Sequence, residues 1–175
     1  MISTAAAPAV IRPGASGLTT RPLGPGDQAE VVAMHERCSM ASRRLRYFSA
    51  KPKLPQRLFD VFCDRSRGLS LAVDDESGRV IALGHMMYDG ASGAAELAFL
   101  VEDAWQNRGI GRRLTELLVE LGRAEGLAEL RASVFSENAR MRKLLTALGG
   151  RTRRTEDPAV LEIVLDLRGA EAAAA

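Results

Sequence analysis

The stretch VEDAWQNRGIGRRLTELL places two glycines between arginines at the start of a strongly helical segment. Glycine lowers helix stability by about 1 kcal/mol relative to alanine, so Gly109 and Gly111 need a reason at this place. The first turn of a helix has unpaired N–H groups and the positive end of the helix dipole, which together bind anions. Glycines let an anion approach the backbone, and the neighbouring arginines add positive charge. The stretch therefore predicts a site for a phosphate or pyrophosphate.

Hydrophobic periodicity on either side of this stretch predicts strands alternating with helices. The three strands expected between residues 70 and 102 are joined by short turns and must pair antiparallel, whereas strand, helix and strand around 94–134 require a parallel crossover. We therefore expect one α+β domain with a mixed, mostly antiparallel sheet and helices on both faces. The expected elements are a strand at 18–23, a helix from Asp27, an irregular basic segment at 39–55, a helix at 54–64, strands at 70–75, 79–89 and 94–102, a helix at 109–125, a strand at 129–135, a helix at 136–150 and a closing hairpin with a strand at 159–167.

Length and composition fit one globular domain in a reducing compartment. The chain has 175 residues, and we expect the domain to span 18–168 between disordered tails at 1–17 and 169–175. A formal net charge of +2 does not point to nucleic acid, and no apolar run reaches the roughly 20 residues of a membrane span. Two cysteines without CxxC spacing do not form a disulfide framework, which fits the cytoplasm. We expect no metal cofactor.

The loop sequence QNRGIG identifies the kind of phosphate site. It departs from GxGxxG because position 114 is leucine, and it lacks the GxxxxGK[ST] pattern of nucleotide triphosphate sites. With Gln106 ahead of the two glycines, it resembles the Q/R-x-x-G-x-G/A pyrophosphate loop of the GNAT superfamily of N-acetyltransferases. The context agrees, because a second helix begins with Asn138 after the next strand. The resemblance covers residues 18–167 and implies the GNAT fold, with acetyl-CoA as cosubstrate.

In that superfamily two central parallel strands splay apart, and the acetyl-pantetheine arm lies between them. The resemblance places these strands at 94–102 and 129–135. It implies that strand backbone groups bind the pantetheine, that N–H groups of the loop hold the pyrophosphate, and that the start of the last helix contacts the cofactor. The asparagine there is equally suited to cap the helix. The expected cofactor-binding residues are Leu100, Val101, Gln106, Asn107, Arg108, Gly109, Ile110, Gly111, Arg112, Arg113, Asn138 and Met141.

Acetylation of an amine needs a base, because an ammonium group cannot attack a thioester. A lysine amine has a pKa of about 10.4 in water and must lose its proton to a positioned group, often through water. Glu96 is the one acid in AAELAFL, and strand alternation puts it on a face with Ala98 and Leu100. We expect Glu96 to be partly buried and to act as the general base; the alternative is a solvated outward-facing residue. A backbone N–H near Val101 is the expected oxyanion donor.

The leaving thiolate has no obvious proton donor in the sequence. Many superfamily members carry a tyrosine seven residues after the asparagine, where this chain has Leu145. Tyr47 and Tyr88 are possible substitutes. His85 is a possible second base, although a structural role fits it better. Trp105 is predicted to anchor the phosphate loop.

The segment RCSMASRRLRYFSAKPKLP bears on the identity of the amine. Seven basic residues and no acid lie between Arg37 and Arg57, which favours a solvated loop or a surface for an acidic partner. SMASRRLRYFS is similar to the S-x-x-S-x-x-x-R-F-F segment of bacterial protein lysine acetyltransferases that modify AMP-forming acyl-CoA synthetases. AELAFLVEDAWQNRGIG and NARMRKLLTALG resemble two further segments of those enzymes. The resemblance implies direct acetyl transfer to a protein lysine. We expect a monomer or a homodimer.

Two other functions stay open at this point. One is acetylation of a small amine such as a polyamine, an amino acid or an antibiotic. A deep acidic pocket beside Glu96 would favour that function, whereas an open groove with a basic rim would favour a protein substrate. The other is a non-catalytic sensor, which would bind the cofactor tightly without acetylating any amine.

Overall fold

The computed structural model describes residues 17–49, 53–90 and 92–168. The tails expected at 1–17 and 169–175 lie outside these residues, apart from Gly17. In chain order the elements are β1 (Thr19–Pro22), the short 3-10 helix η1 (Pro25–Asp27), α1 (Gln28–Arg37), α2 (Met40–Tyr47), α3 (Gln56–Cys63), β2 (Gly68–Asp74), β3 (Val80–Tyr88), β4 (Ala94–Val101), η2 (Asp103–Trp105), α4 (Ile110–Ala124), β5 (Glu129–Phe135), α5 (Ala139–Ala147), β6 (Arg151–Arg154) and β7 (Val160–Asp166).

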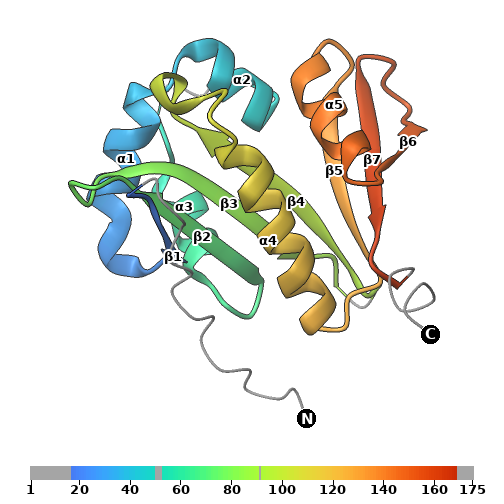
Figure 1. Ribbon diagram of the computed structural model, residues 1–175, viewed down its shortest axis with the longest axis horizontal. Coiled ribbons are helices and arrows are strands. Elements are labelled where there is room, and N and C mark those ends of the chain that lie inside the picture. Colours follow the sequence, from blue (N-terminus) through green and yellow to red (C-terminus); the bar gives the residue numbers. More distant parts are fainter. Residues whose placement is uncertain (1–16, 50–52, 91, 169–175) are drawn as a thin grey trace.

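A seven-stranded sheet with the order β1-β2-β3-β4-β5-β7-β6 forms the centre of the molecule (Figure 1). Every neighbouring pair of strands is antiparallel except β4 and β5, which are parallel. Helix α4 is the crossover between these two strands, because parallel neighbours cannot be joined by a tight turn. The mixed, mostly antiparallel sheet expected from the sequence is confirmed.

Strands β4 and β5 stay together over a short distance. Their register runs from Ala94 opposite Glu129 to Glu96 opposite Arg131, a span of three residue pairs. Beyond this point the two strands separate, and Figure 1 shows them diverging toward α2 and α5. The splay of the central parallel strands is therefore present.

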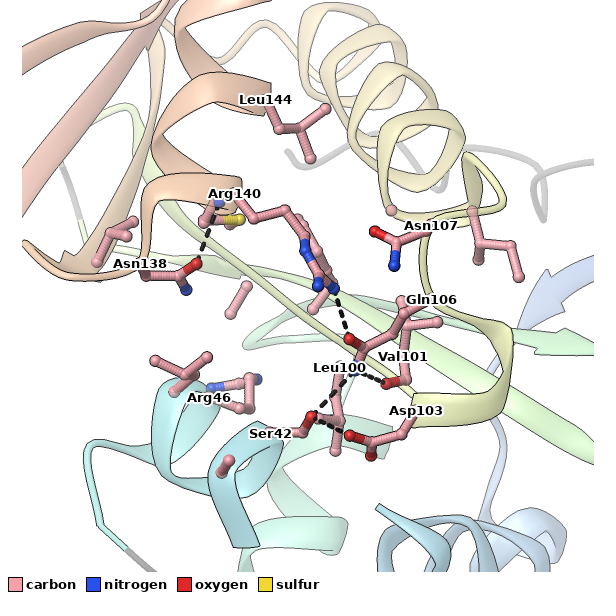
Figure 2. A pocket seen from close by; sticks show the side chains of 18 of the residues that line it. Ser42, Arg46, Leu100, Val101, Asp103, Gln106, Asn107, Asn138, Arg140 and Leu144 are labelled. Atoms are coloured by element: carbon pink, nitrogen blue, oxygen red, sulfur yellow. Dashed lines mark hydrogen bonds between the residues drawn. The ribbon is translucent and has the colours of Figure 1, made fainter. Parts of the chain in front are cut away.

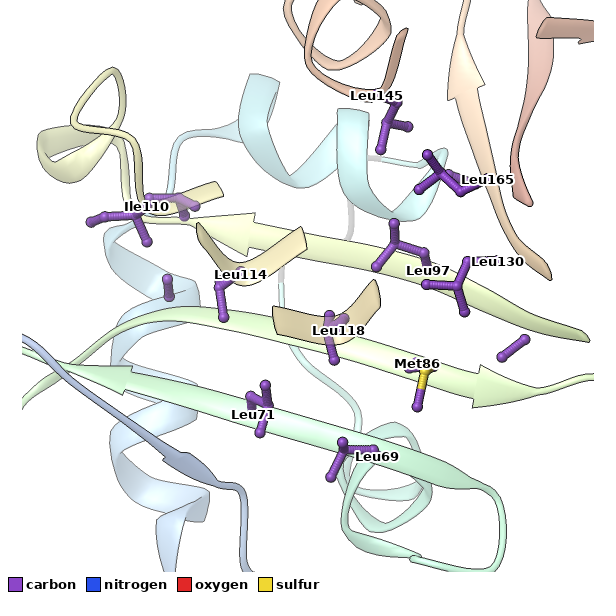
Figure 3. Packing of buried hydrophobic residues seen from close by; sticks show 14 of the residues in the cluster. Leu69, Leu71, Met86, Leu97, Ile110, Leu114, Leu118, Leu130, Leu145 and Leu165 are labelled. Carbon is purple, nitrogen blue, oxygen red and sulfur yellow. The ribbon is translucent and has the colours of Figure 1, made fainter. Parts of the chain in front are cut away.

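Apolar side chains cover both faces of the sheet. On one face, Leu114 and Leu118 of α4 and Leu145 of α5 pack against the strands, as Figure 3 shows. On the other face, Met34 of α1 and Phe59 of α3 belong to a second buried cluster. Helices therefore cover both faces, as the sequence pattern predicted.

Helix α2 corrects the expectation of an irregular segment at 39–55. Most of MASRRLRY consists of good helix formers, and Ser39 caps the helix by accepting the N–H of Ser42 at 3.1 Å. Phe48 ends it in a left-handed conformation. No residue of α2 is buried, so the apolar period that identifies a packed helix is missing from the sequence.

The packing of α4 on the sheet can be tested at Leu118, which has no exposed surface. Leu118→Ala should lower the free energy of unfolding by about 2–5 kcal/mol, because it removes apolar contacts and leaves a cavity. Urea unfolding followed by circular dichroism gives the value. Glu120→Ala, at an exposed position of the same helix, is the matched control and should stay within about 0.5 kcal/mol of the parent. Equal stability of the two variants would contradict the packing.

Candidate active site

A cavity of about 980 Å³ lies where β4 and β5 diverge. Figure 2 shows its walls, which come from α2, the end of β4, the loop before α4, and α5. Ala98, Phe99, Leu100 and Val101 of β4 line one side, and Ser133 of β5 lies on the other. Segments far apart in the sequence thus surround one elongated space between two strands.

Hydrogen bonds at the two ends of β4 decide which backbone groups face this space. The N–H of Glu102 donates to a carbonyl of β3 at 2.9 Å, whereas the carbonyl of Gly93 accepts the N–H of Ala128, just ahead of β5, at 2.7 Å. Backbone groups alternate in direction along a strand. The N–H and C=O groups of Phe99 and Val101 therefore point toward the gap. This is the orientation expected for an oxyanion donor near Val101.

Leu100 is oriented differently from the expectation. The same alternation turns its backbone groups toward β3, where it lies opposite Leu83, so they are not directed at a ligand in the gap. Its side chain packs in the cluster that contains α1 and α3. Leu100 lines the cavity, but the backbone groups that face the gap are those of Phe99 and Val101.

The side chain of Gln106 connects three parts of the site. Its Nε2 donates to the carbonyl of Val101 and to Oγ of Ser42, both at 3.0 Å, and its Oε1 accepts from Arg140 of α5 (Figure 2). Gln106 lies at the cavity, as predicted for a cofactor residue. Its amide also joins β4, α2 and α5, which the sequence did not indicate.

Asp103 attaches α2 to the same loop. Its carboxylate accepts the N–H of Ser39 at 2.8 Å, the hydroxyl of Ser39 at 2.7 Å and the hydroxyl of Ser42 at 2.9 Å. Desolvation opposes ionisation, but these hydrogen bonds prevail and hold the pKa of Asp103 below its usual value. Sequence reasoning assigned no role to Asp103 or to the two serines. A signal was present for the serines, because Ser39 and Ser42 are the two fixed serines of the S-x-x-S-x-x-x-R-F-F pattern quoted above.

Two left-handed residues shape the loop, Asn107 with φ 62° and Gly109 with φ 80°. Gly109 is the N-cap of α4, so the free N–H groups of the first helical turn begin at Ile110. The left-handed conformation favours glycine, which has no Cβ to clash with the backbone. Gly109 therefore has a conformational reason that is independent of any ligand.

Gly111 has a different reason. A Cβ at this position would lie 3.0 Å from Cε2 of Phe99, whose ring packs under the start of α4. The two glycines thus serve two purposes, a left-handed turn and a close helix–strand contact. Both arrangements leave the backbone of the helix start bare beside the cavity.

The arginines of the loop are partly engaged within the protein. Arg108 lies over the ring of Trp105 at 4.8 Å, and Arg112 pairs with Glu116 at 2.8 Å, while Arg113 is exposed. Trp105 packs against the larger core, which supports its predicted role as an anchor. The arginines contribute positive potential at the helix start, and the backbone N–H groups provide the directed donors.

The start of α5 contributes Asn138 and Met141 to the cavity wall. The Oδ1 of Asn138 accepts the N–H of Met141 at 3.1 Å, so the asparagine caps the helix as the alternative reading proposed. Leu145, at the position where relatives carry tyrosine, is fully buried in the core. The residue that α5 presents to the cavity in its place is Leu144.

Glu96 is exposed, which corrects the expectation of partial burial. The predicted alternation holds, since Leu97 and Leu100 pack into opposite clusters. Glu96 is also the last residue of β4 that pairs with β5, so the strands part beside it and solvent reaches its side chain. Glu96 does not line the cavity, but Ala98 on the same face does.

The other candidate acids and bases lie off the cavity. His85 is 1% exposed, forms a 2.9 Å hydrogen bond through Nδ1 with Oγ of Ser70, and stacks on Phe62. Burial lowers the pKa of His85 well below its ordinary value, which keeps the ring neutral and supports the structural role. Tyr88 donates its hydroxyl to Glu125. Neither Tyr88 nor Tyr47 is among the described residues that line the cavity.

The basic segment between Arg37 and Arg57 is partly committed to internal contacts. Arg37 pairs with the buried Glu102 at 2.8 Å, and Arg44 pairs with Glu137 beside the cavity. Lys51 lies outside the described residues. The segment is therefore not a simple solvated loop, and part of its charge is neutralised within the protein.

The splayed parallel strands and the bare helix start define an acetyl-CoA-dependent N-acetyltransferase. Residues 37–149 match the Acetyltransferase (GNAT) family, and the chain belongs to that family.

Solved structures agree with this assignment. The GNAT domain of PAT from S. lividans has a TM-score of 0.79 at 28% identity, over 85% of this chain and 90% of that one. A putative acetyltransferase from Salmonella typhimurium, solved with its cofactor acetyl-CoA, has a TM-score of 0.71 at 19% identity, over 87% and 95% of the two chains. A cAMP-binding acyltransferase from Mycobacterium smegmatis has a TM-score of 0.60 at 23% identity, over 88% of this chain and 45% of that one.

No group of three or more His, Cys, Asp or Glu residues in the described part of the chain is arranged to hold a metal ion. None of the helices in that part of the chain has the length and apolar character needed to cross a bilayer.

Stability measured without ligand shows whether the backbone conformation, and not clearance for a ligand, requires glycine at position 109. Gly109→Ala should lower the free energy of unfolding by about 1–2 kcal/mol, because a Cβ disfavours the left-handed conformation. Gly109→Asn should cost less, since asparagine adopts this conformation more readily. Chemical denaturation without ligand measures both variants. Equal losses would mean that the backbone conformation is not what requires the glycine.

Proposed function

We propose that this N-acetyltransferase acetylates a lysine side chain of a protein, with an AMP-forming acyl-CoA synthetase as the expected substrate. The observation that carries the proposal is the contact between two motif segments. Ser39 and Ser42 of SMASRRLRYFS are bonded to Asp103 of AELAFLVEDAWQNRGIG, so two of the three segments that resemble protein lysine acetyltransferases meet at the cavity. The likeness to the GNAT domain of S. lividans PAT supports the same reading.

The charge around the cavity also favours an acidic protein surface over a polyamine. The described lining residues include four arginines and two carboxylates, Asp103 and Glu137. Both carboxylates are already bonded, one to serines and the other to Arg44. A basic rim fits an acidic protein surface better than it fits a polyamine.

In the proposed mechanism, Val101 and the start of α4 hold acetyl-CoA, and the amine enters from the side of Glu96. The ammonium loses its proton to Glu96, through a water molecule because Glu96 lies beside the cavity and not within its wall. The free amine attacks the thioester carbonyl to form a tetrahedral intermediate. The N–H of Val101, which points into the gap, stabilises the oxygen of that intermediate.

The intermediate then collapses by breaking the carbon–sulfur bond. The acetyl group stays on the amine, which releases its second proton to solvent, and CoA leaves as a thiolate. Neither Leu144 nor Leu145 of α5 has a proton to give. We therefore propose that solvent protonates the thiolate.

Replacing Glu96 by glutamine tests its role as base. Glu96→Gln should lower kcat about 100-fold or more, the usual contribution of general base catalysis, while acetyl-CoA affinity stays unchanged. Steady-state kinetics and calorimetric titration measure the two quantities. Glu120→Gln, on the exposed side of α4, is the matched control. Unchanged turnover in Glu96→Gln would end the assignment.

The substrate class is tested by incubating the protein with labelled acetyl-CoA and a cell lysate. The label should appear on lysine side chains of one or a few proteins, which mass spectrometry identifies. Glu96→Gln is the control for transfer without the enzyme. Label found only in small amines would contradict the proposal, and tight binding of acetyl-CoA without transfer would indicate a sensor.

A further inference from the structure

Arg46 of α2 lines the cavity, yet the proposed mechanism does not use it. Its guanidinium lies 5.0 Å from the ring centre of Tyr47 and 5.8 Å from that of Phe62. Phe62 stacks on His85, and His85 is opposite Ala98 in the register of β3 and β4. Arg46 therefore lies toward the Ala98 end of the cavity, within electrostatic reach of Glu96, and away from the pyrophosphate loop.

The hydrogen-bond donors of Arg46 are unused within the described residues. Its Nε is buried without a partner, and no carboxylate in that part of the chain forms an ion pair with it. Burial lowers the pKa of Arg46, while Tyr47 and Glu96 favour its charged form from a distance. A guanidinium keeps its charge in proteins, so Arg46 is a partly buried cation with hydrogen-bond donors left over.

A partly buried cation without an acceptor is costly unless a ligand supplies one. The neighbouring arginines show the contrast, because Arg37 and Arg44 each have a carboxylate partner. The phosphates of acetyl-CoA are expected at the start of α4, on the other side of the site. A group that accepts hydrogen bonds from Arg46 must therefore be part of the amine substrate, the acetyl acceptor.

We propose that Arg46 is a specificity-determining residue that binds a carboxylate carried by the acceptor. The planar guanidinium matches a carboxylate with two parallel hydrogen bonds. Glu96 and Arg46 would then contact the acceptor at two points, its amine and its acid. The carboxylate belongs either to an acidic side chain beside the target lysine or to a free amino acid. The first source rests on the function proposed above, and the second does not.

The test compares acceptors that differ in one carboxylate. Lysine peptides with Asp or Glu within three residues of the lysine are paired with the same peptides carrying Asn or Gln, and free lysine is paired with lysinamide. For at least one pair, kcat/KM of the parent protein should favour the carboxylate about 10-fold to 100-fold, the range of a charge-assisted hydrogen bond. The difference should lie mainly in the KM of the acceptor.

Variants connect this preference to Arg46. In Arg46→Gln the ratio within each pair should fall to about one while the KM for acetyl-CoA is unchanged, and Arg46→Lys should keep part of the ratio because it retains charge without the planar fork. Arg57→Gln, at an exposed position of α3, should keep the full ratio. Thermal unfolding confirms that each variant is folded. No preference in the parent protein, or a preference that survives in Arg46→Gln, would overturn the inference.

The two acceptor pairs separate this inference from the proposed function. A preference confined to the peptides assigns the carboxylate to an acidic side chain near the target lysine. If no peptide or protein lysine is acetylated, the proposed function fails. A preference for lysine over lysinamide that disappears in Arg46→Gln would then still support the carboxylate site, with a free amino acid as its source.

Discussion

The site depends on the short pairing of β4 with β5. The two strands are hydrogen-bonded over three residue pairs and then diverge. Because pairing stops at Glu96, the backbone of Phe99 and Val101 has no strand to bond and points toward a gap. The same divergence exposes Glu96 and opens the cavity into which α2 and α5 place their side chains. An extended ligand in this gap would take the place of the missing strand.

The open gap is held in shape by polar contacts between segments distant in sequence. Asp103 bonds the start of α2, and Gln106 bonds Ser42, Val101 and Arg140. These contacts join α2, the loop before α4 and α5 in one network. The network holds the start of α2, while Tyr47 near its end packs against the second buried cluster.

Charges near the site fall into two groups. Arg37, Arg44 and Arg112 have carboxylate partners within the protein. Arg46 has none within the described residues, although its Nε is buried. The unpaired guanidinium of Arg46 lies toward the Ala98 end of the cavity, on the side from which the amine is proposed to enter. It is the reason for proposing an amine substrate that carries a carboxylate.

The sequence by itself determined the fold, the order of nearly all elements and the glycine turn at the start of α4, because periodicity and glycine placement are local signals. It did not predict α2, which has no buried residue and whose start is bonded to Asp103, 64 residues away from Ser39. The sequence also suggested that Glu96 is partly buried, and that Gly109 and Gly111 both serve to let an anion approach the backbone. Tertiary structure decided otherwise, because exposure depends on where β5 leaves β4, and the need for Gly111 depends on the ring of Phe99.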